Sequence, residues 1–295
     1  MATSISRRVN QFCLASSLAL VPLCAQEPTF CTDCPGLATG GLHFTPPGAV
    51  TIFFGGEYQP GYNNPVAGVT GNLWRLPTIG LRLGISDNAE IRLSWVANNV
   101  LHVRSQPTPP VFQTYGSTTK DPGDVLLETL VKIKDESPGG FAYGMKIGVK
   151  LPNSDEKKGI GVNTTDVFAS LLLAKTLSPR FIVYGDFGLG ILTEPTKTYT
   201  QNDVLTYGLM SDFLFSENWH FVTEAVGRRS NNKGFGGTES RGMFKGGVEW
   251  DNGRFTYNLL LLHGLTKYDG NGVGVAFNVA CRIGFIRSTR AWAAR

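Results

Sequence analysis

Apolar and polar residues alternate along most of this chain in runs of about ten residues, the strand length that crosses a membrane in a bacterial outer-membrane barrel. In residues 140–152, apolar side chains occupy the odd positions, and the even positions between Gly144 and Lys150 carry glycine or lysine. Successive side chains of a strand point to opposite faces. Each run therefore predicts a strand with one apolar and one polar face.

The runs predict about twelve strands, which cover approximately residues 49–58, 71–86, 90–103, 124–134, 140–152, 166–177, 181–193, 203–215, 219–229, 240–250, 254–265 and 272–285. Tight turns alternate with longer polar connections at 59–70, 104–123, 153–165, 194–202, 230–239 and 266–271. Bacterial barrels have short periplasmic turns and long extracellular loops. We therefore expect an all-β fold, an antiparallel transmembrane β-barrel over residues 49–285 with both termini periplasmic.

The apolar face of each strand is predicted to point outward into lipid. A soluble barrel would turn that face inward and would expose Arg82, Arg92 and the other charges of the polar face, in a chain of which only 17% is charged. Aromatic residues also gather beside the short turns, where rings favour the membrane boundary; they are Phe141, Phe181, Phe213, Phe215, Trp219, Phe221, Trp250, Phe255, Tyr257 and Phe285. Phe285 resembles the strand-terminal aromatic that the barrel-assembly machinery recognises, and a basic tail, 286–295, follows it.

The first 25 residues are predicted to be a secretion signal, with a positive start at Arg7 and Arg8 and an apolar run over Phe12–Cys24. A membrane helix, lipoprotein processing at Cys24 and twin-arginine export are weaker alternatives, because the run is short, Leu23 is bulky and the expected apolar residues after the arginine pair are missing. Export and the strand pattern together indicate the outer membrane of a Gram-negative bacterium, with its lipids as partners.

Composition changes this picture little. The formal net charge is +4, and removal of the signal brings it near neutral, so nothing favours nucleic-acid binding. We expect no cofactor, because the glycine-rich stretch at 185–190 is not followed by a helix and is no phosphate loop.

Residues 26–48 contain Pro35, Pro46, Pro47 and several glycines, which exclude a regular helix or central strand. The segment either hangs in the periplasm or folds into the bore as a plug. Within it, Cys31 and Cys34 form a CxxC pair. A local disulfide is the favoured state in an oxidising compartment, with a redox pair, a metal site or free thiols as alternatives.

The polar faces assign a set of charged and amide residues to the lumen, as a candidate solute path: Arg82, Glu90, Arg92, Glu128, Lys132, Lys146, Lys150, Asp186, Asp212, Glu224, Arg228, Lys245, Glu249, Asn258, Asn278 and Arg282. Both signs are present on neighbouring strands. One interpretation is a ladder of salt bridges across a narrow bore. The other is a polar path lined by charge rings that select a solute.

Several short motifs are similar to one known family. Residues 150–155 (KLPNSD), 158–161 (KGIG), 165–167 (TDV) and 83–92 (LGISDNAEIR) resemble the outer-membrane transporters of the phenol meta-pathway (phenol degradation) protein family. The resemblance covers roughly residues 75–285. It implies a barrel that passes small, aromatic or apolar compounds, and it transfers no catalytic residue.

A lipid acyl hydrolase is the competing function, because His263 and Ser240 share the outward face of neighbouring predicted strands. However, outer-membrane phospholipases carry His and Ser two residues apart on one strand, and no histidine here has that neighbour. We therefore expect a channel or transporter for small solutes and no enzyme, with the hydrolase and a closed structural barrel as the alternatives.

Overall fold

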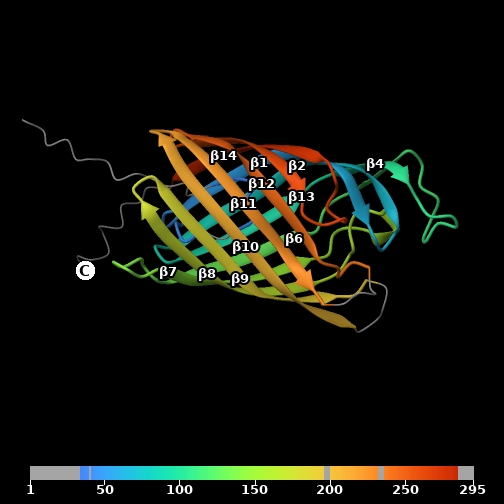
Figure 1. Ribbon diagram of the computed structural model, residues 1–295, viewed down its shortest axis with the longest axis horizontal. Helices are drawn as coiled ribbons and strands as arrows, with labels where there is room; N and C mark the ends of the chain where they lie inside the picture. Colours follow the sequence, from blue (N-terminus) through green and yellow to red (C-terminus); the bar gives the residue numbers. More distant parts are fainter. Residues whose placement is uncertain (1–33, 40, 196–199, 232–235, 285–295) are drawn as a thin grey trace, which may run out of the picture.

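The computed structural model describes residues 34–39, 41–195, 200–231 and 236–284 (Figure 1). The predicted secretion signal, Cys31, Phe285 and the basic tail lie outside the described residues. No helix in the described ranges is long and apolar enough to cross a membrane.

The strands are β1 (Ala49–Asn64), β2 (Val69–Ser86), β3 (Ala89–Val96), β4 (Asn99–Ser105), β5 (Thr118–Asp121), β6 (Val125–Lys134), β7 (Ala142–Leu151), β8 (Asp166–Ser178), β9 (Phe181–Thr193), β10 (Gln201–Ser216), β11 (Trp219–Ser230), β12 (Arg241–Asp251), β13 (Phe255–Gly264) and β14 (Val273–Gly284). One 3-10 turn, η1 (Glu156–Lys158), lies between β7 and β8.

These segments form one closed antiparallel barrel. β3 and β4 pair with successive parts of β2 and therefore act as one interrupted strand. β5 pairs with β4 and β6 pairs with β3, so β5 and β6 form the next interrupted strand. The 14 segments therefore make 14 − 2 = 12 barrel strands. Pairing of β1 with β14, from Ala49 opposite Gly284 to Tyr58 opposite Val275, closes the wall. The predicted barrel of about twelve strands is confirmed.

The barrel has two different ends. Short turns such as those between β2 and β3 and between β10 and β11 lie at one end, here called the short-turn end, and longer connections such as that between β4 and β5 lie at the opposite, long-loop end (Figure 1). Two expected loop boundaries were wrong. Residues 59–64 continue β1, with register shifts near Gly55 and between Gln59 and Tyr62, and residues 118–121 form β5 inside the expected loop 104–123.

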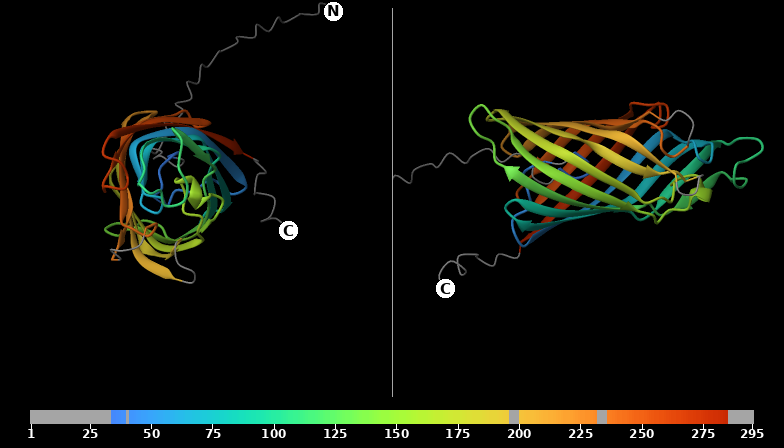
Figure 2. Two further views of the ribbon diagram at one scale, coloured as in Figure 1. Left: turned by 90° about the vertical axis from the view of Figure 1, so that its right-hand side faces the viewer. Right: turned by 90° about the horizontal axis from the view of Figure 1, so that it is seen from below.

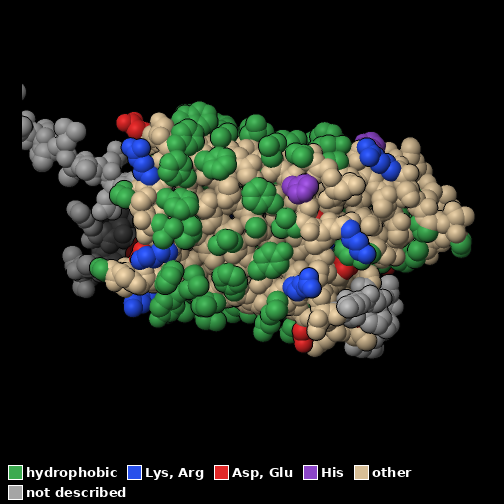
Figure 3. All heavy atoms as spheres, in the orientation of Figure 1, with side chains coloured by type: hydrophobic (Ala, Val, Ile, Leu, Met, Phe, Trp, Pro, Cys, Tyr) green, Lys and Arg blue, Asp and Glu red, His purple; other side chains and the backbone are tan. Residues whose placement is uncertain are grey.

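The outer wall is apolar. Phe187, Leu189, Leu205 and Leu261 are each at least half exposed there, and Figure 3 shows hydrophobic side chains over the middle of the visible wall, with most of its charged side chains toward the two ends. Aromatic rings meet beside the short turns in the pairs Phe181–Phe213, Phe215–Trp219 and Trp250–Tyr257. This distribution matches the apolar belt and aromatic girdle of a transmembrane barrel.

The interior is filled from two sides. Residues 34–39 and 41–48, here called the inner segment, precede β1 and lie within the barrel wall, as the end-on view in Figure 2 shows in blue. Residues 152–165, here called the inner loop, carry η1 and lie inside the same outline in yellow-green (Figure 2).

Candidate functional site

The inner segment enters the bore beside β2. The Gly48 N–H donates to Gly84 O at 2.8 Å, and the Ala49 N–H donates to Pro46 O at 2.9 Å. A Cβ at Gly84 would lie 2.2 Å from Thr45 O and 2.3 Å from Pro46 O. Only glycine therefore lets the segment pass this close to the wall.

Two buried carboxylates of the wall hold the segment by its backbone. Glu90 Oε2 accepts from the Thr45 N–H at 2.7 Å. Glu224 Oε1 accepts from the Ala38 N–H at 2.8 Å and from the Thr39 N–H at 2.5 Å. Both glutamates are fully buried. Charge-assisted bonds of this kind are stronger than neutral ones, so the segment is tied to two different strands.

Further bonds reach the start of the described segment. Lys245 Nζ donates to Gly36 O and Asn258 Nδ2 donates to Pro35 O, each at 2.6 Å. Cys34 is buried and disulfide-bonded. Its predicted partner, Cys31, lies outside the described residues. The segment thus crosses the bore from β2 and β3 to β11, β12 and β13.

Apolar packing adds to these bonds. Leu37 and Leu42 of the segment are buried in one cluster with inward-facing wall residues, which include Leu130, Leu172, Ile182, Tyr184, Met210, Val222, Leu260 and Leu262. The predicted lumen set contained only polar residues, so this apolar cluster was not predicted. The signal was present, because these leucines occupy the same strand parity as the predicted lumen charges.

His43 contacts the wall at Tyr184. The Tyr184 hydroxyl and His43 Nδ1 lie 3.2 Å apart, and the two rings meet edge to face at 6.1 Å. Burial lowers the pKa of the His43 imidazole below its ordinary value, and the Lys132 ammonium lowers it further. Three carboxylates act in the opposite direction; they belong to Asp212, Glu136 and Asp135.

Oppositely charged side chains on neighbouring strands of the wall form ion pairs inside the barrel. Lys146 Nζ bonds to Asp186 and lies 3.5 Å from Glu128 Oε1. Lys150 Nζ lies 2.7 Å from Asp166 Oδ2 and 3.4 Å from Asp124 Oδ2. Asp124 directly precedes β6, and the other residues come from β6, β7, β8 and β9, which the register brings side by side.

Other predicted charges surround the segment. Arg92 Nε donates to Glu90 Oε1 at 2.5 Å, and the Arg82 guanidinium lies 4.8 Å from the Phe53 ring centre. Asp212 Oδ1 lies 2.9 Å from His220 Nδ1, with both side chains buried. Lys245 Nζ lies 3.5 Å from Glu224 Oε2. Asn258 Nδ2 lies 3.3 Å from Glu249 Oε2, and Asn278 Nδ2 donates to Asn258 Oδ1 at 3.0 Å.

Three predicted residues lie toward the ends of the bore. Lys132 pairs with Asp135 at 2.7 Å, and Arg282 lies 3.9 Å from Asp251 and donates to Gly253 O, all beside short turns. Arg228 lies toward the long-loop end, where it donates to the carbonyls of Gly237 and Glu239.

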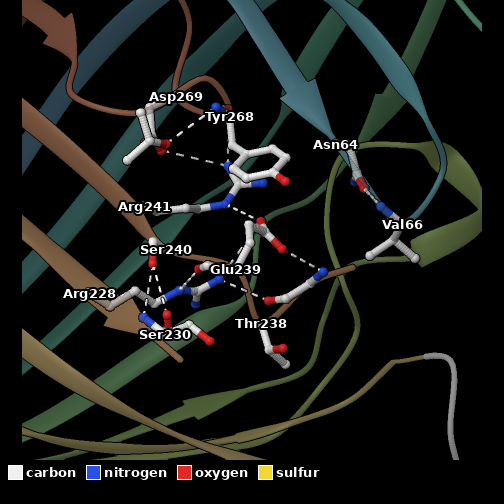
Figure 4. A network of polar contacts seen from close by, with 12 residues as sticks. Asn64, Val66, Arg228, Ser230, Thr238, Glu239, Ser240, Arg241, Tyr268 and Asp269 are labelled. Carbon is white, nitrogen blue, oxygen red and sulfur yellow. Dashed lines mark hydrogen bonds and ion pairs between the residues drawn. The ribbon is translucent and has the colours of Figure 1, made fainter. Parts of the chain in front are cut away.

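Arg228 belongs to a network that joins three connections at the long-loop end (Figure 4). Arg241 Nε donates to Glu239 Oε1 at 2.6 Å, and its Nη2 donates to Asn63 O at 3.1 Å. Asp269 accepts from the Gly242 N–H at 2.8 Å. Arg241 was not among the predicted lumen residues, although it shares the inward parity of Lys245 and Glu249 on the same strand.

The inner loop is fixed in the mouth beside this network. Tyr115 donates to Lys157 O at 2.8 Å, Thr119 donates to Lys158 O at 3.1 Å, and Asn64 Nδ2 donates to Ile160 O at 3.1 Å. Ile160 packs in a buried cluster with Tyr62, Ala67, Val69, Leu73, Leu101 and Tyr115. Part of the long-loop end is therefore covered.

Among the described residues, two cavities of roughly 320 and 310 Å³ lie inside the barrel. Both are lined by Ala38 of the inner segment and by Leu126 and Glu128 of β6. The first also contacts Phe53, Arg82 and Arg92, and the second contacts Phe168, Met243, Lys146 and Asp186. Each is thus an amphipathic space whose wall carries charges of both signs.

Ser240 and His263, the pair suggested for a hydrolase, each lie beside other residues. The Ser240 hydroxyl accepts from the Ser230 N–H at 2.9 Å and donates to Ser230 O at 3.3 Å. His263 lies opposite Phe244 in the β12–β13 pairing.

Comparison with known proteins supports the fold. The COG4313 outer membrane channel from Pseudomonas putida F1 is similar over 84% of this chain and 100% of its own, with a TM-score of 0.62 and 13% identity. The translocator domain of the autotransporter NalP from Neisseria meningitidis matches 83% of this chain and 91% of its own, with a TM-score of 0.48 and 13% identity. The KdgM porin in complex with disordered oligogalacturonate matches 80% of this chain and 99% of its own, with a TM-score of 0.47 and 8% identity. No protein-family profile and no curated protein matches the sequence. The first of these similarities shows that this chain has the fold of an outer-membrane β-barrel.

Proposed function

We propose that this protein is an outer-membrane channel for small solutes whose bore is closed by its own inner segment. The observation that carries the proposal is the course of that segment, which crosses the bore and forms part of the lining of both interior cavities. A barrel that served only as a structural element would need neither the amphipathic cavities nor an internal segment tied by Glu90 and Glu224.

The cavity lining favours neutral, largely apolar solutes, aromatic compounds among them. Charges that line the cavities are paired with opposite charges, as in the Lys146–Asp186 and Arg75–Glu57 pairs. Paired charges attract a free ion less than an unpaired ring does. Leu126, Phe168 and Met243 supply apolar contact area beside them, as expected for small-molecule sites. The resemblance to the phenol meta-pathway family agrees with this solute class.

The same proposal includes the membrane in which the barrel lies and its orientation there. The barrel lies in the outer membrane of a Gram-negative bacterium, with the short-turn end in the periplasm and the long-loop end outside. It reaches the membrane through its secretion signal and the barrel-assembly machinery. It has no enzymatic activity, which the binding of the Ser240 hydroxyl to the Ser230 backbone supports.

Single-channel conductance of the refolded protein tests the proposal. The first variant lacks residues 27–45, and the second is Thr39→Cys/Gly208→Cys. A Cβ at Gly208 would lie 2.7 Å from Thr39 Oγ1 and 3.3 Å from Thr39 Cγ2, which puts the new thiols within disulfide reach. We expect the deletion to raise conductance and the oxidised double variant to silence the channel until reductant is added. Wild-type protein with reductant controls for the disulfide of Cys34.

Liposome swelling with neutral and charged solutes of one size then tests selectivity. Faster entry of the neutral solutes through the deletion variant is expected. Equal conductance of the wild type and a correctly inserted deletion variant would show that the segment does not close the bore. Silence of both would support a closed structural barrel, and acyl hydrolysis by the silent protein would support the hydrolase.

A further inference from the structure

One row of outward-facing side chains crosses five neighbouring strands near the long-loop end. Strand register places Val275 of β14 opposite Tyr58, Tyr58 opposite Trp74, Trp74 opposite Val100, and Val100 opposite Lys120 of β5. Neighbouring strands lie about 4.8 Å apart, so Lys120 is about 10 Å from Trp74 along the row. The row therefore begins apolar, passes through two aromatic rings and ends in a cation.

The apolar part of this row lines a groove on the outer wall. A hollow of roughly 300 Å³ is bounded by Tyr58, Trp74, Leu76, Val275 and Phe277, together with the backbone near Gly55 and Gly56. The groove lies where β2 has one residue more than β1, between the Gly55–Thr78 and Glu57–Arg75 pairs. Gly56 has no side chain to fill it, and Leu76 lies directly over that position.

The two rings at this groove mark a membrane boundary. The Tyr58 and Trp74 ring centres are 4.5 Å apart, and the Trp74 side chain is exposed. Tyr and Trp favour the level of the lipid headgroups. A groove that starts at such rings and continues over Val275 and Phe277 faces acyl chains.

Basic residues continue the surface beyond the rings. His102, Arg104 and Lys120 are exposed on β4 and β5, in the hairpin that extends farthest at the long-loop end (Figure 1). Residues 58–74 and 99–120 contain no Asp or Glu. Arg229 on β11 is also exposed, but it has an acid near it. Its register partner on β10 is Leu205, and the exposed acid Asp203 lies two residues from Leu205. The outward face of β4 and β5 thus carries basic side chains and no acid, above an apolar groove.

We propose that this surface binds a phosphorylated glycolipid of the outer leaflet, with one acyl chain in the groove and a headgroup phosphate at Lys120 and Arg104. The proposal rests on the outward placement of the long-loop end in the proposed function. An acyl chain in the groove buries apolar area, and phosphate oxygens form strong charge-assisted bonds with Lys and Arg. The lipid covers the wall where β1 and β2 are irregular.

Binding of bisphosphorylated hexa-acyl lipid A to the refolded, fluorescently labelled protein in detergent tests this inference. We expect Arg104→Glu/Lys120→Glu to weaken binding at least about tenfold, and the matched control Arg229→Glu to change it less than about twofold. Trp74→Ala should also weaken binding of lipid A. Lipid A stripped of its phosphates should bind the wild type as weakly as intact lipid A binds the double variant.

Three outcomes would overturn the inference: unchanged affinity of the double variant, equal loss in the Arg229→Glu control, or equally tight binding of phosphatidylglycerol, which would indicate a general anionic-lipid surface. Heat-modifiable migration on gels shows that each variant is folded.

Conductance of the double variant in the same preparation separates the two proposals. Unchanged lipid binding by the double variant with normal conductance contradicts only the lipid site, whereas lipid binding by a protein that conducts no solute after the 27–45 deletion contradicts only the channel.

Discussion

At the residue scale, charges inside the barrel are stabilised by partners rather than by open water. Glu224 is fully buried, and its carboxylate accepts two backbone N–H groups of the inner segment while Lys245 lies 3.5 Å away. A buried carboxylate that loses such partners costs several kcal/mol unless water replaces them. The two-residue period is the basis on which these charges were assigned to one strand face. It could not predict their pairing, because strand register and the course of the inner segment decide which groups meet.

Protonation of His43 should loosen the inner segment. Its pKa is lowered from 6.5 when the segment is docked, mainly by burial. Below pH 6.5 the undocked imidazole takes up a proton that the docked one resists, so docking weakens as the pH falls. The charged or titratable groups around it are Lys132, Asp135, Glu136, Asp212 and Tyr184.

We therefore expect channel conductance to rise as the pH is lowered from about 7.5 to about 5.5. His43→Gln stays neutral and should remove most of this change, whereas His263→Gln on the outer wall should not. An unaltered pH profile in His43→Gln would assign the effect to another group.

At the scale of elements, the strand pattern is reliable where the wall is regular and misleading where it bulges. β1 continues past Tyr58 although Pro60 and Gly61 read as a turn, because these two residues fall in the register shift between Gln59 and Tyr62 and Gly61 adopts φ +69°. The other register shift, between Gly55 and Glu57, has its extra residue on β2 and brings Arg75 to inward Glu57, although Arg75 has the opposite parity to inward Arg82. Bulges depend on how two strands fit together, so one strand's sequence does not reveal them.

Gly84 should be decisive for docking of the inner segment on β2. Alanine there would place a methyl group 2.2 Å from Thr45 O. Because this oxygen belongs to the backbone, it cannot move away from the methyl group as the end of a flexible side chain could. We expect Gly84→Ala to raise conductance while the barrel still folds. Gly246→Ala is the matched control, because its nearest neighbour is the edge of Phe244 at 3.4 Å. Equal conductance of the two variants would show that this contact does not position the segment.

At the scale of the whole molecule, both ends of the bore are obstructed by parts of the same chain. The inner segment crosses it below the cavities, and the inner loop with the Arg228–Glu239–Arg241 network covers part of the long-loop end. The sequence indicated the barrel and left the place of residues 26–48 open. Short segments without periodicity carry no pattern that says where they pack, and only the inward leucines of the wall, such as Leu130 and Leu172, show that something apolar must cover them.

Topology is the property on which both proposals depend, and cysteine labelling of intact cells tests it. The background carries Cys281→Ser, since Cys281 is a free thiol. Single cysteines at Ser117 and Asn231 lie at the long-loop end, and those at Ser137 and Asn252 lie in short turns. We expect a membrane-impermeant maleimide to label the first pair in intact cells and the second pair only after the outer membrane is permeabilised, because bacterial barrels keep their short turns in the periplasm. Labelling of Ser137→Cys and Asn252→Cys alone in intact cells would show that the barrel has the opposite orientation, with its short turns outside. The lipid site would then face the inner leaflet, and the inner segment would close the channel from outside.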